Sequence, residues 1–152
     1  MKMTKKILIF ILTIVMLSGC AGKGNLEIDI NSLCNELLDK GDFEDELSSI
    51  DGDVIKQLYD IDDYSEAQVY ISSGATAEEI AVFKFDNQES AQEGLKKAQN
   101  RIEEQKQGFE SYIPKEVKKL DDALIERYDS YVIVCVSNSD EAEKIVNQYV
   151  KK

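Results

Sequence analysis

The spacing of apolar residues along the chain changes several times beyond an apolar N-terminal run. From residue 29 to residue 39, apolar residues recur every three or four positions, which predicts a helix that Gly41 ends. The spacing over residues 43–50 predicts a turn followed by a short helix, and residues 54–59 predict a further short helix. These segments together form a predicted N-terminal helical segment.

Two strand-strand-helix units follow this segment. Alternating or continuous apolar runs bounded by turn residues predict four strands, and apolar stripes at helical spacing predict the helices. The predicted strands are residues 67–71, 79–85, 123–128 and 131–136, and the predicted helices are residues 88 to about 109, 114–120 and 139–150. Pro114 can begin the short helix because its missing N–H is no loss at a first helical position.

The two units align with each other at an offset of 51 residues, which places Ala81 on Val132 and Ala91 on Ala142. Duplication and chance likeness between two amphipathic units both account for this weak repeat. The predicted fold class is α+β. It has the N-terminal helical segment, then two strand-strand-helix units that form a four-stranded, mainly antiparallel sheet with helices packed on it.

The last predicted strand, residues 131–136, is apolar on both faces. If helices covered only one face of the sheet, the other face would be an apolar patch for a partner or a second copy. We expect instead that the first helix acts as a lid over that face through Leu33, Cys34, Leu37 and Leu38.

The N-terminus has the features of an export signal. Lys2, Lys5 and Lys6 precede an apolar run over residues 7–17. A membrane-spanning helix needs about 20 apolar residues, so this run is too short to span a bilayer and has the length of a signal-peptide core. An ordinary secreted signal peptide and an uncleaved N-terminal anchor are alternatives to the lipoprotein signal described next.

The sequence Leu17-Ser18-Gly19-Cys20 resembles the lipobox of bacterial lipoproteins. The resemblance implies a signal peptide over residues 1–19 that is cleaved between Gly19 and Cys20, and a diacylglyceryl group on the Cys20 thiol. Two acyl chains hold a protein stably on a bilayer. The implied location is the outer, extracytoplasmic face of the cell membrane.

Behind the lipidated cysteine, the sequence predicts a tether and one folded unit. Residues 20–28 contain Gly22 and Gly24 and are predicted to form a short flexible tether. Residues 29–152 are predicted to form a single α+β domain, since 152 residues suffice for one domain.

Composition excludes several function classes. The chain has 18 Lys and Arg against 30 Asp and Glu, no His, and a net charge of −12 at pH 7. Without His, catalysis by an imidazole base and His-ligated metals are excluded. A strongly acidic protein repels phosphate backbones, so we expect no nucleic-acid partner. The acidic run from Asp60 to Glu66 lacks the ligand spacing of a calcium loop, and we expect no metal site or other cofactor.

One loop is a candidate binding site. Ser72, Ser73, Gly74 and Thr76 could present hydroxyl and backbone N–H groups to an anion, a peptide terminus or a partner. The alternative is a compact turn in which Gly74 supplies a positive φ and Thr76 bonds locally.

The remaining cysteines, Cys34 and Cys135, fall on apolar faces. We expect buried free thiols, and a disulfide is the alternative for an exported protein.

Five segments together are similar to a known family. They are the lipobox, Phe43–Leu47, Leu58–Asp62, Ser73–Lys84 and Tyr112–Glu116. With them, the chain resembles the domain-of-unknown-function 4358 family of small Gram-positive lipoproteins. The resemblance implies a lipid-anchored envelope protein and implies no activity, substrate or catalytic residues.

No catalytic motif accompanies these features. The expected function is therefore a non-enzymatic binding or interaction module at the cell envelope, with an envelope protein or a small ligand as its partner. Two alternatives are a cell-envelope hydrolase that uses paired carboxylates and a structural or dimeric envelope component.

Overall fold

The computed structural model describes residues 25–151 of the chain. The predicted signal peptide, the cleavage site and Cys20 lie outside the described residues. The helices and strands are α1 (Ile30–Lys40), β1 (Ser48–Ser49), α2 (Gly52–Tyr59), β2 (Glu66–Ile71), β3 (Glu79–Lys84), α3 (Gln88–Tyr112), the 3₁₀ turn η1 (Pro114–Glu116), α4 (Val117–Asp121), β4 (Leu124–Tyr128), β5 (Tyr131–Val136) and α5 (Glu141–Val150). The α+β class and the positions of the long elements are confirmed.

The described sheet is antiparallel throughout, and its strand order is β1-β2-β3-β5-β4. It has five strands where the sequence predicted four. The additional strand β1 lies in the segment for which a turn and a short helix were predicted, and that prediction is wrong. A short helix gains little from its own hydrogen bonds, whereas the edge of β2 offers backbone partners. Ser48 and Ser49 pair with Ile71 and Tyr70, and the Ile50 N–H donates to Val69 O at 3.0 Å.

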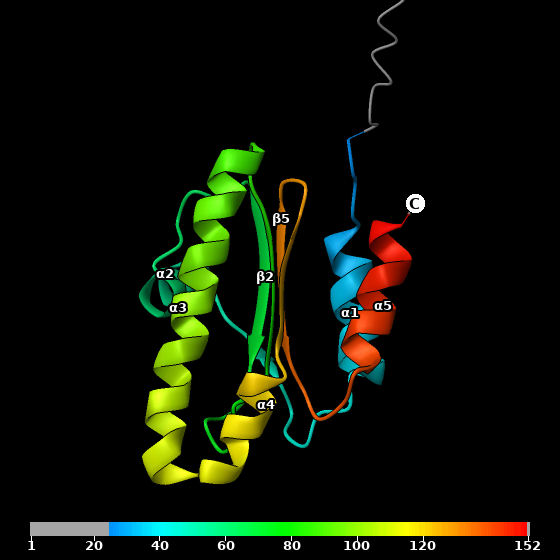
Figure 1. The fold of residues 1–152 in the computed structure, drawn as a ribbon. Helices are drawn as coiled ribbons and strands as arrows, with labels where there is room; N and C mark the ends of the chain where they lie inside the picture. The colour runs from blue at the N-terminus through cyan, green and yellow to red at the C-terminus, as the bar shows by residue number, and fades with distance from the viewer. Residues whose placement is uncertain (1–24, 152) are drawn as a thin grey trace, which may run out of the picture.

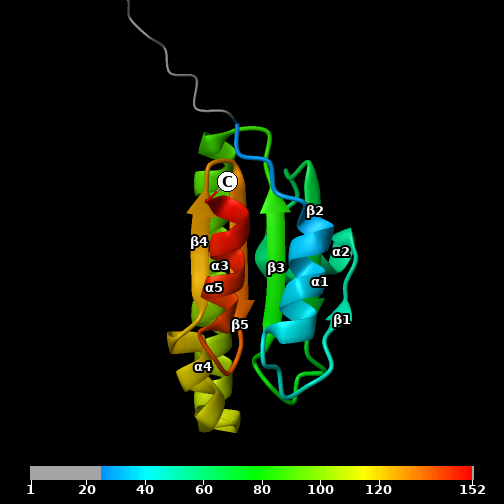
Figure 2. The same ribbon diagram turned by 90° about the vertical axis from the view of Figure 1, so that its right-hand side faces the viewer.

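Helices cover both faces of the sheet (Figure 1). Helices α2, α3 and α4 lie on one side, and α1 and α5 lie side by side on the other, in front of the sheet in Figure 2. The α1/α5 side buries Ile80, Val82, Ile133 and Cys135 of the sheet and Ile30, Leu33, Cys34, Leu37, Ile145 and Val146 of the helices. The predicted lid is therefore confirmed, with Leu38 partly buried at its margin.

The strands of the internal repeat are arranged symmetrically, because Val82 pairs with its aligned residue Ile133, but the helices of the repeat are not. Ala91 of α3 is buried among Phe83, Phe85 and Val134, whereas its aligned residue Ala142 of α5 is buried on the opposite face of the sheet. Two units related by a two-fold axis through an antiparallel sheet would carry their helices on the same face. The two helices, α3 and α5, instead pack on opposite faces of the sheet (Figure 1).

The chain enters the domain at one end of the sheet. The Glu27 carboxylate accepts hydrogen bonds from Lys84 Nζ at 2.9 Å and from Tyr131 Oη at 3.2 Å. Lys84 and Tyr131 face each other across β3 and β5, and Glu79 pairs with Val136 at the other end of the same two strands. A strand of this length spans about 17 Å. Of the predicted tether, residues 25–28 lie within the described residues, and Ile28 is buried against the domain.

No helix among the described residues is long and apolar enough to cross a membrane.

Candidate functional site

A buried carboxylate, Glu78, organises the end of the sheet opposite the point of chain entry. Glu78 ends the loop between β2 and β3, and its side chain is fully enclosed. The backbone N–H groups of Glu44 and Asp45 donate to this carboxylate at 2.9–3.0 Å. Its other donors are Thr76 Oγ1 at 3.0 Å, Lys119 Nζ at 2.9 Å and Asn138 Nδ2 at 3.2 Å. Burial alone would raise the pKa of Glu78, but these backbone and lysine donors outweigh it and lower the pKa.

The Lys119 ammonium joins three carboxylates. It lies 2.9 Å from Glu78, 3.2 Å from Glu116 and 3.4 Å from Glu44. The side chain of Lys119 is only 10 % exposed. Burial would lower its pKa, but the hydrogen bonds to Glu78 and Glu116 outweigh burial and raise it. Lys119 Nζ donates a hydrogen bond to Glu78, and Glu116 and Glu44 lie around the same ammonium as ion-pair partners.

Only one of the two carboxylate oxygens of Glu116 accepts a hydrogen bond from the described residues. Oε2 accepts from the Ala77 N–H at 3.0 Å. Oε1 is buried and has no hydrogen-bond partner among the described residues. Lys115 Nζ lies 3.8 Å from Oε1, which is beyond hydrogen-bond distance. Most buried polar atoms are hydrogen-bonded, so this oxygen needs an explanation.

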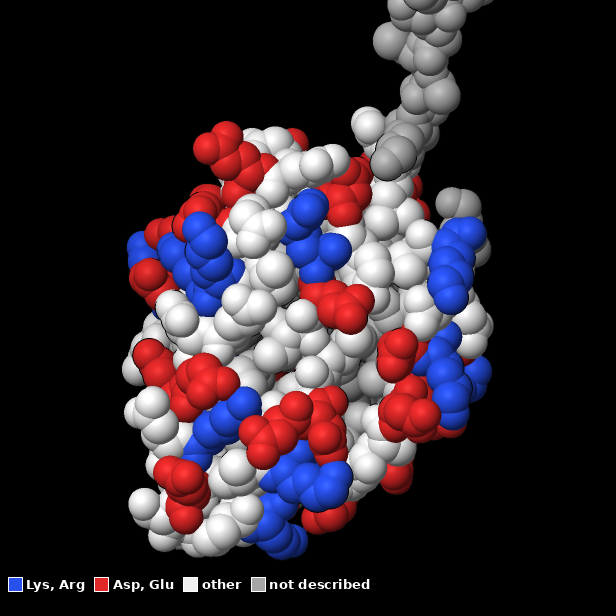
Figure 3. Space-filling view, viewed as in Figure 1, with Lys and Arg blue, Asp and Glu red and all other residues white. Residues whose placement is uncertain are grey.

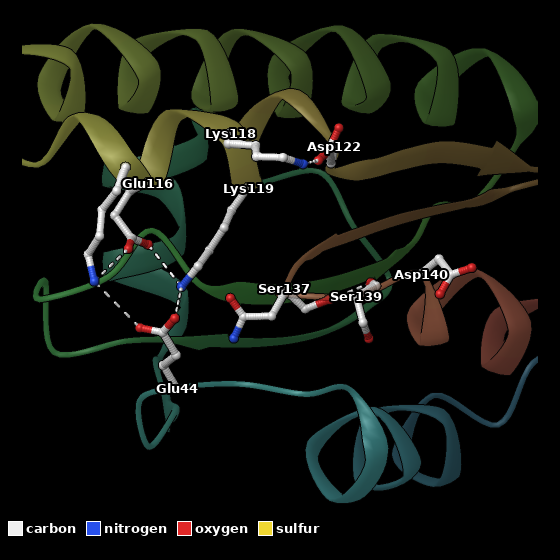
Figure 4. A pocket seen from close by; sticks show the side chains of 10 residues that line it. Glu44, Glu116, Lys118, Lys119, Asp122, Ser137, Ser139 and Asp140 are labelled. Atoms are coloured by element: carbon white, nitrogen blue, oxygen red, sulfur yellow. Dashed lines mark hydrogen bonds and ion pairs between the residues drawn. The ribbon is translucent and has the colours of Figure 1, made fainter.

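These side chains line a pocket of about 580 Å³. Its lining residues are Glu44, Lys115, Glu116, Lys118, Lys119, Asp122, Ser137, Asn138, Ser139 and Asp140. Figure 4 shows Glu44, Glu116 and Lys119 gathered on one side of the pocket, with Ser137 and Ser139 across from them. Residues from η1, α4, the segment before β1 and the link between β5 and α5 therefore meet here.

The surface over this end carries both signs of charge. Figure 3 shows lysine and acidic side chains adjoining one another, with no extended patch of one sign on this face. A mixed surface of this kind does not attract a polyanion or a polycation over a large area.

The predicted loop residues lie beside the Glu78 cluster but outside the pocket lining. Gly74 has the positive φ of 95° expected of a tight turn. The Ser72 hydroxyl donates to Thr76 O at 2.6 Å, and the Ser73 hydroxyl donates to Asp45 at 2.7 Å. Thr76 donates to Glu78. These hydroxyl donors serve the protein's own acceptors, as in the compact-turn alternative.

A second buried carboxylate, Glu79, lies under α3 and is sealed from solvent. Tyr59 Oη donates to it at 2.5 Å, Gln105 Nε2 at 2.9 Å and Arg101 at 3.2 Å. Burial, and then the charge of Glu79, raise the pKa of Tyr59 well above its ordinary value, which keeps the phenol protonated as a donor. Arg101 Nε and Gln105 Oε1 have no hydrogen-bond partner among the described residues.

Cys34 and Cys135 are free and buried, as expected. Burial raises the pKa of each thiol to about 12. Neither thiol is therefore a nucleophile at neutral pH.

Within residues 25–151, no group of three or more Asp, Glu or Cys side chains is placed to hold a metal ion. In the acidic run, Asp60 pairs with Lys97 at 3.4 Å and Asp62 pairs with Lys56 at 2.5 Å.

Sequence reasoning did not single out Glu78, Glu116 or Lys119. One signal could have found them, since the segments that carry the family resemblance meet in the two carboxylate clusters. Phe43–Leu47, Ser73–Lys84 and Tyr112–Glu116 supply residues around Glu78, and Leu58–Asp62 supplies Tyr59 to the Glu79 cluster.

Residues 39–137 match the family model described as Domain of unknown function (DUF4358). The matched region contains every strand of the described sheet, and α1 lies almost wholly and α5 wholly beyond it. Comparison with curated proteins and comparison with solved structures give no match.

Proposed function

The chain belongs to the DUF4358 family, and from this premise we propose that the protein is a lipid-anchored, extracytoplasmic binding module of the cell envelope. In this proposal residues 1–19 are a lipoprotein signal peptide and Cys20 carries a diacylglyceryl group. The folded domain binds an envelope partner or ligand without catalysing a reaction.

One observation carries the binding role: the pocket lies at the end of the sheet opposite the point of chain entry. Glu27 docks at the Lys84 end of β3, and Glu116 and Lys119 lie at the Glu79 end. In Figure 1, α4 at the pocket end and the start of α1 lie at opposite ends of the domain. A protein anchored through residue 20 would therefore present this pocket away from the bilayer.

The electrostatics of the site favour binding over hydrolysis. A glycosidase-type mechanism needs one carboxyl group that stays protonated, which requires a raised pKa. The pKa of Glu78 is lowered instead. Lys119 lies among Glu44, Glu78 and Glu116 and pairs with each of them. These groups are therefore arranged as an ion-pair network.

The anchor is tested by Cys20→Ala in the full chain. We expect the precursor to accumulate uncleaved and the lipid label on the protein to disappear, because the substitution removes the acylated thiol. Metabolic labelling with a fatty-acid probe and the mass of the chain report both effects. Ser18→Thr is the control and should be processed. Normal lipid labelling of Cys20→Ala would overturn the anchor.

The binding role is tested by photo-crosslinking in cells that carry the intact anchor. A photoreactive residue at Lys118, which is exposed at the pocket, should give a specific adduct. The same residue at Lys96, which is exposed on α3 away from the pocket, should give none. Equal adducts from both positions, or none from position 118, would contradict the role of the pocket.

A further inference from the structure

We infer that the pocket binds its ligand through a primary ammonium group, which takes the place that Lys115 Nζ occupies between Glu44 and Glu116. This inference rests on the proposed binding role and specifies the chemistry of the same site. Glu116 Oε1 is the group that calls for such a ligand, since it is a buried carboxylate oxygen that lines the pocket without a hydrogen bond.

The structure already holds an ammonium at this position, but loosely. Lys115 Nζ is 3.7 Å from Glu44 Oε2 and 3.8 Å from Glu116 Oε1. A charge-assisted hydrogen bond from an ammonium to a carboxylate is about 2.8 Å long, so neither contact is one. The position between Glu44 and Glu116 therefore admits an ammonium that its own lysine does not bond closely.

Lys115 can leave this position without disturbing the core. Its side chain is 69 % exposed, and an ion pair made by an exposed lysine contributes little to stability. Lys119 cannot take its place, because its ammonium already pairs with Glu44, Glu78 and Glu116. Lys118 is occupied with Asp122. An ammonium from outside the chain can therefore replace Lys115 and approach both oxygens closely.

The charge of the pocket agrees with a cationic ligand. The lining acids Glu44, Glu116, Asp122 and Asp140 outnumber the lining lysines, which are Lys115, Lys118 and Lys119. Glu78 adds a further negative charge directly behind the lining. When the Lys115 side chain swings out, Glu44 and Glu116 face the vacated space. Their negative electrostatic potential there favours a positive group.

The remaining space suits a polar body attached to the ammonium. A volume of about 580 Å³ lies within the range of small-ligand sites. Ser137 and Ser139 line the side of the pocket away from Glu116 (Figure 4) and offer neutral polar groups. A lysine-type side chain of a peptide fits this combination, and a free aliphatic diamine has the same ammonium chemistry without the polar body.

The test is a calorimetric titration of the detergent-purified full chain with three probes. They are Nα-acetyl-lysine methylamide, the same compound acetylated on Nε, and 1,5-diaminopentane. We expect the first probe to bind and its neutral Nε-acetyl form not to bind, because acetylation removes the charge and two donors. Tighter binding of the lysine amide assigns a peptide source, and tighter binding of the diamine assigns a free amine. Failure of both cationic probes, or equal binding of the neutral one, would overturn the inference.

Variants locate the probe. Lys115→Ala removes the internal competitor and should tighten binding of the lysine amide by about tenfold, whereas Glu44→Gln should weaken it by about tenfold. Lys118→Ala is the matched control, because it removes another exposed lysine of the same pocket and should change binding by about twofold or less. Equal effects of Lys115→Ala and Lys118→Ala would show that only the net charge of the pocket affects binding. That result would contradict the assigned position between Glu44 and Glu116.

The two proposals fail separately. If no cationic probe binds while the crosslink from position 118 persists, the ammonium is wrong and the binding module stands. If that crosslink is absent and the probes still bind as expected, the pocket chemistry stands and the proposed envelope partner does not.

Discussion

Glu78 and Glu79 are neighbours in the chain, and both side chains are buried, yet they lie in different surroundings. Glu79 faces α2 and α3, and Tyr59, Gln105 and Arg101 of these helices enclose it. Glu78 faces the end of the sheet, where Lys119 connects it to the pocket. The same residue type thus serves a sealed cluster that fixes α2 and α3 on the sheet and an open cluster that borders a candidate binding site. The difference lies in what covers each carboxylate, and four experiments probe it.

The largest effect is expected from Arg101→Ala, which removes the cation of the sealed cluster. Removing one partner of a buried ion pair lowers the free energy of unfolding by about 3 kcal/mol or more, because the remaining charge stays buried. The free energy of unfolding from urea denaturation measures the loss. Lys96→Ala on the same helix removes an exposed pair with Glu93 and should cost less than about 0.5 kcal/mol. A similar small loss in both variants would show that Glu79 is not sealed.

A smaller effect is expected from Gly94→Ala, which tests how closely α3 covers the sheet. A Cβ at Gly94 would overlap the ring of Phe85, and overpacking of a core costs about 1–3 kcal/mol. Gly108→Ala is the matched control on the same helix, because a Cβ there meets nothing within 4 Å. Alanine is the better helix former, so Gly108→Ala should stabilise the protein by up to about 1 kcal/mol. Thermal unfolding of the two variants should therefore shift in opposite directions.

The open cluster should reveal itself through pH. The pKa of Glu78 is lower in the folded protein than in the unfolded chain, so its contribution is present above the ordinary glutamate value of about 4.3. That contribution is lost as the pH falls through the lower folded value. Glu78→Gln should therefore unfold more easily at pH 7 and show a shallower loss of stability in acid than the parent chain. Parallel stability curves for the two proteins would contradict this.

The smallest effect is expected at the thiols beneath α1. Because burial raises the pKa of Cys34 and Cys135 to about 12, a thiol reagent at pH 8 should label neither in the folded protein. Both should react at once in denaturant, which a change in mass records. To keep the count to these two residues, the measurement is made on the Cys20→Ala chain. Rapid labelling of the native chain would mean that α1 opens readily.

The sequence predicted most of the framework, because each long element repeats its own period over enough residues. It also predicted that the last strand is apolar on both faces, and every residue of β5 is buried in the structure. The edge strand β1 was missed, since Ser48 and Ser49 have no strand pattern of their own and are extended only because β2 lies beside them. The face of the sheet on which each helix packs was also not predictable from the repeat. The alignment of two positions does not specify the direction in which the chain turns before the helix.

The acidic balance and the lack of histidine are statements about the chain itself, and the sequence determined them alone. The tertiary structure decided which of the 30 Asp and Glu residues enter the buried carboxylate clusters. Glu78 and Lys119 lie 41 positions apart and meet because α4 returns along the end of the sheet. A carboxylate gains a special environment only from groups brought around it in space, and no periodicity along the chain encodes that meeting.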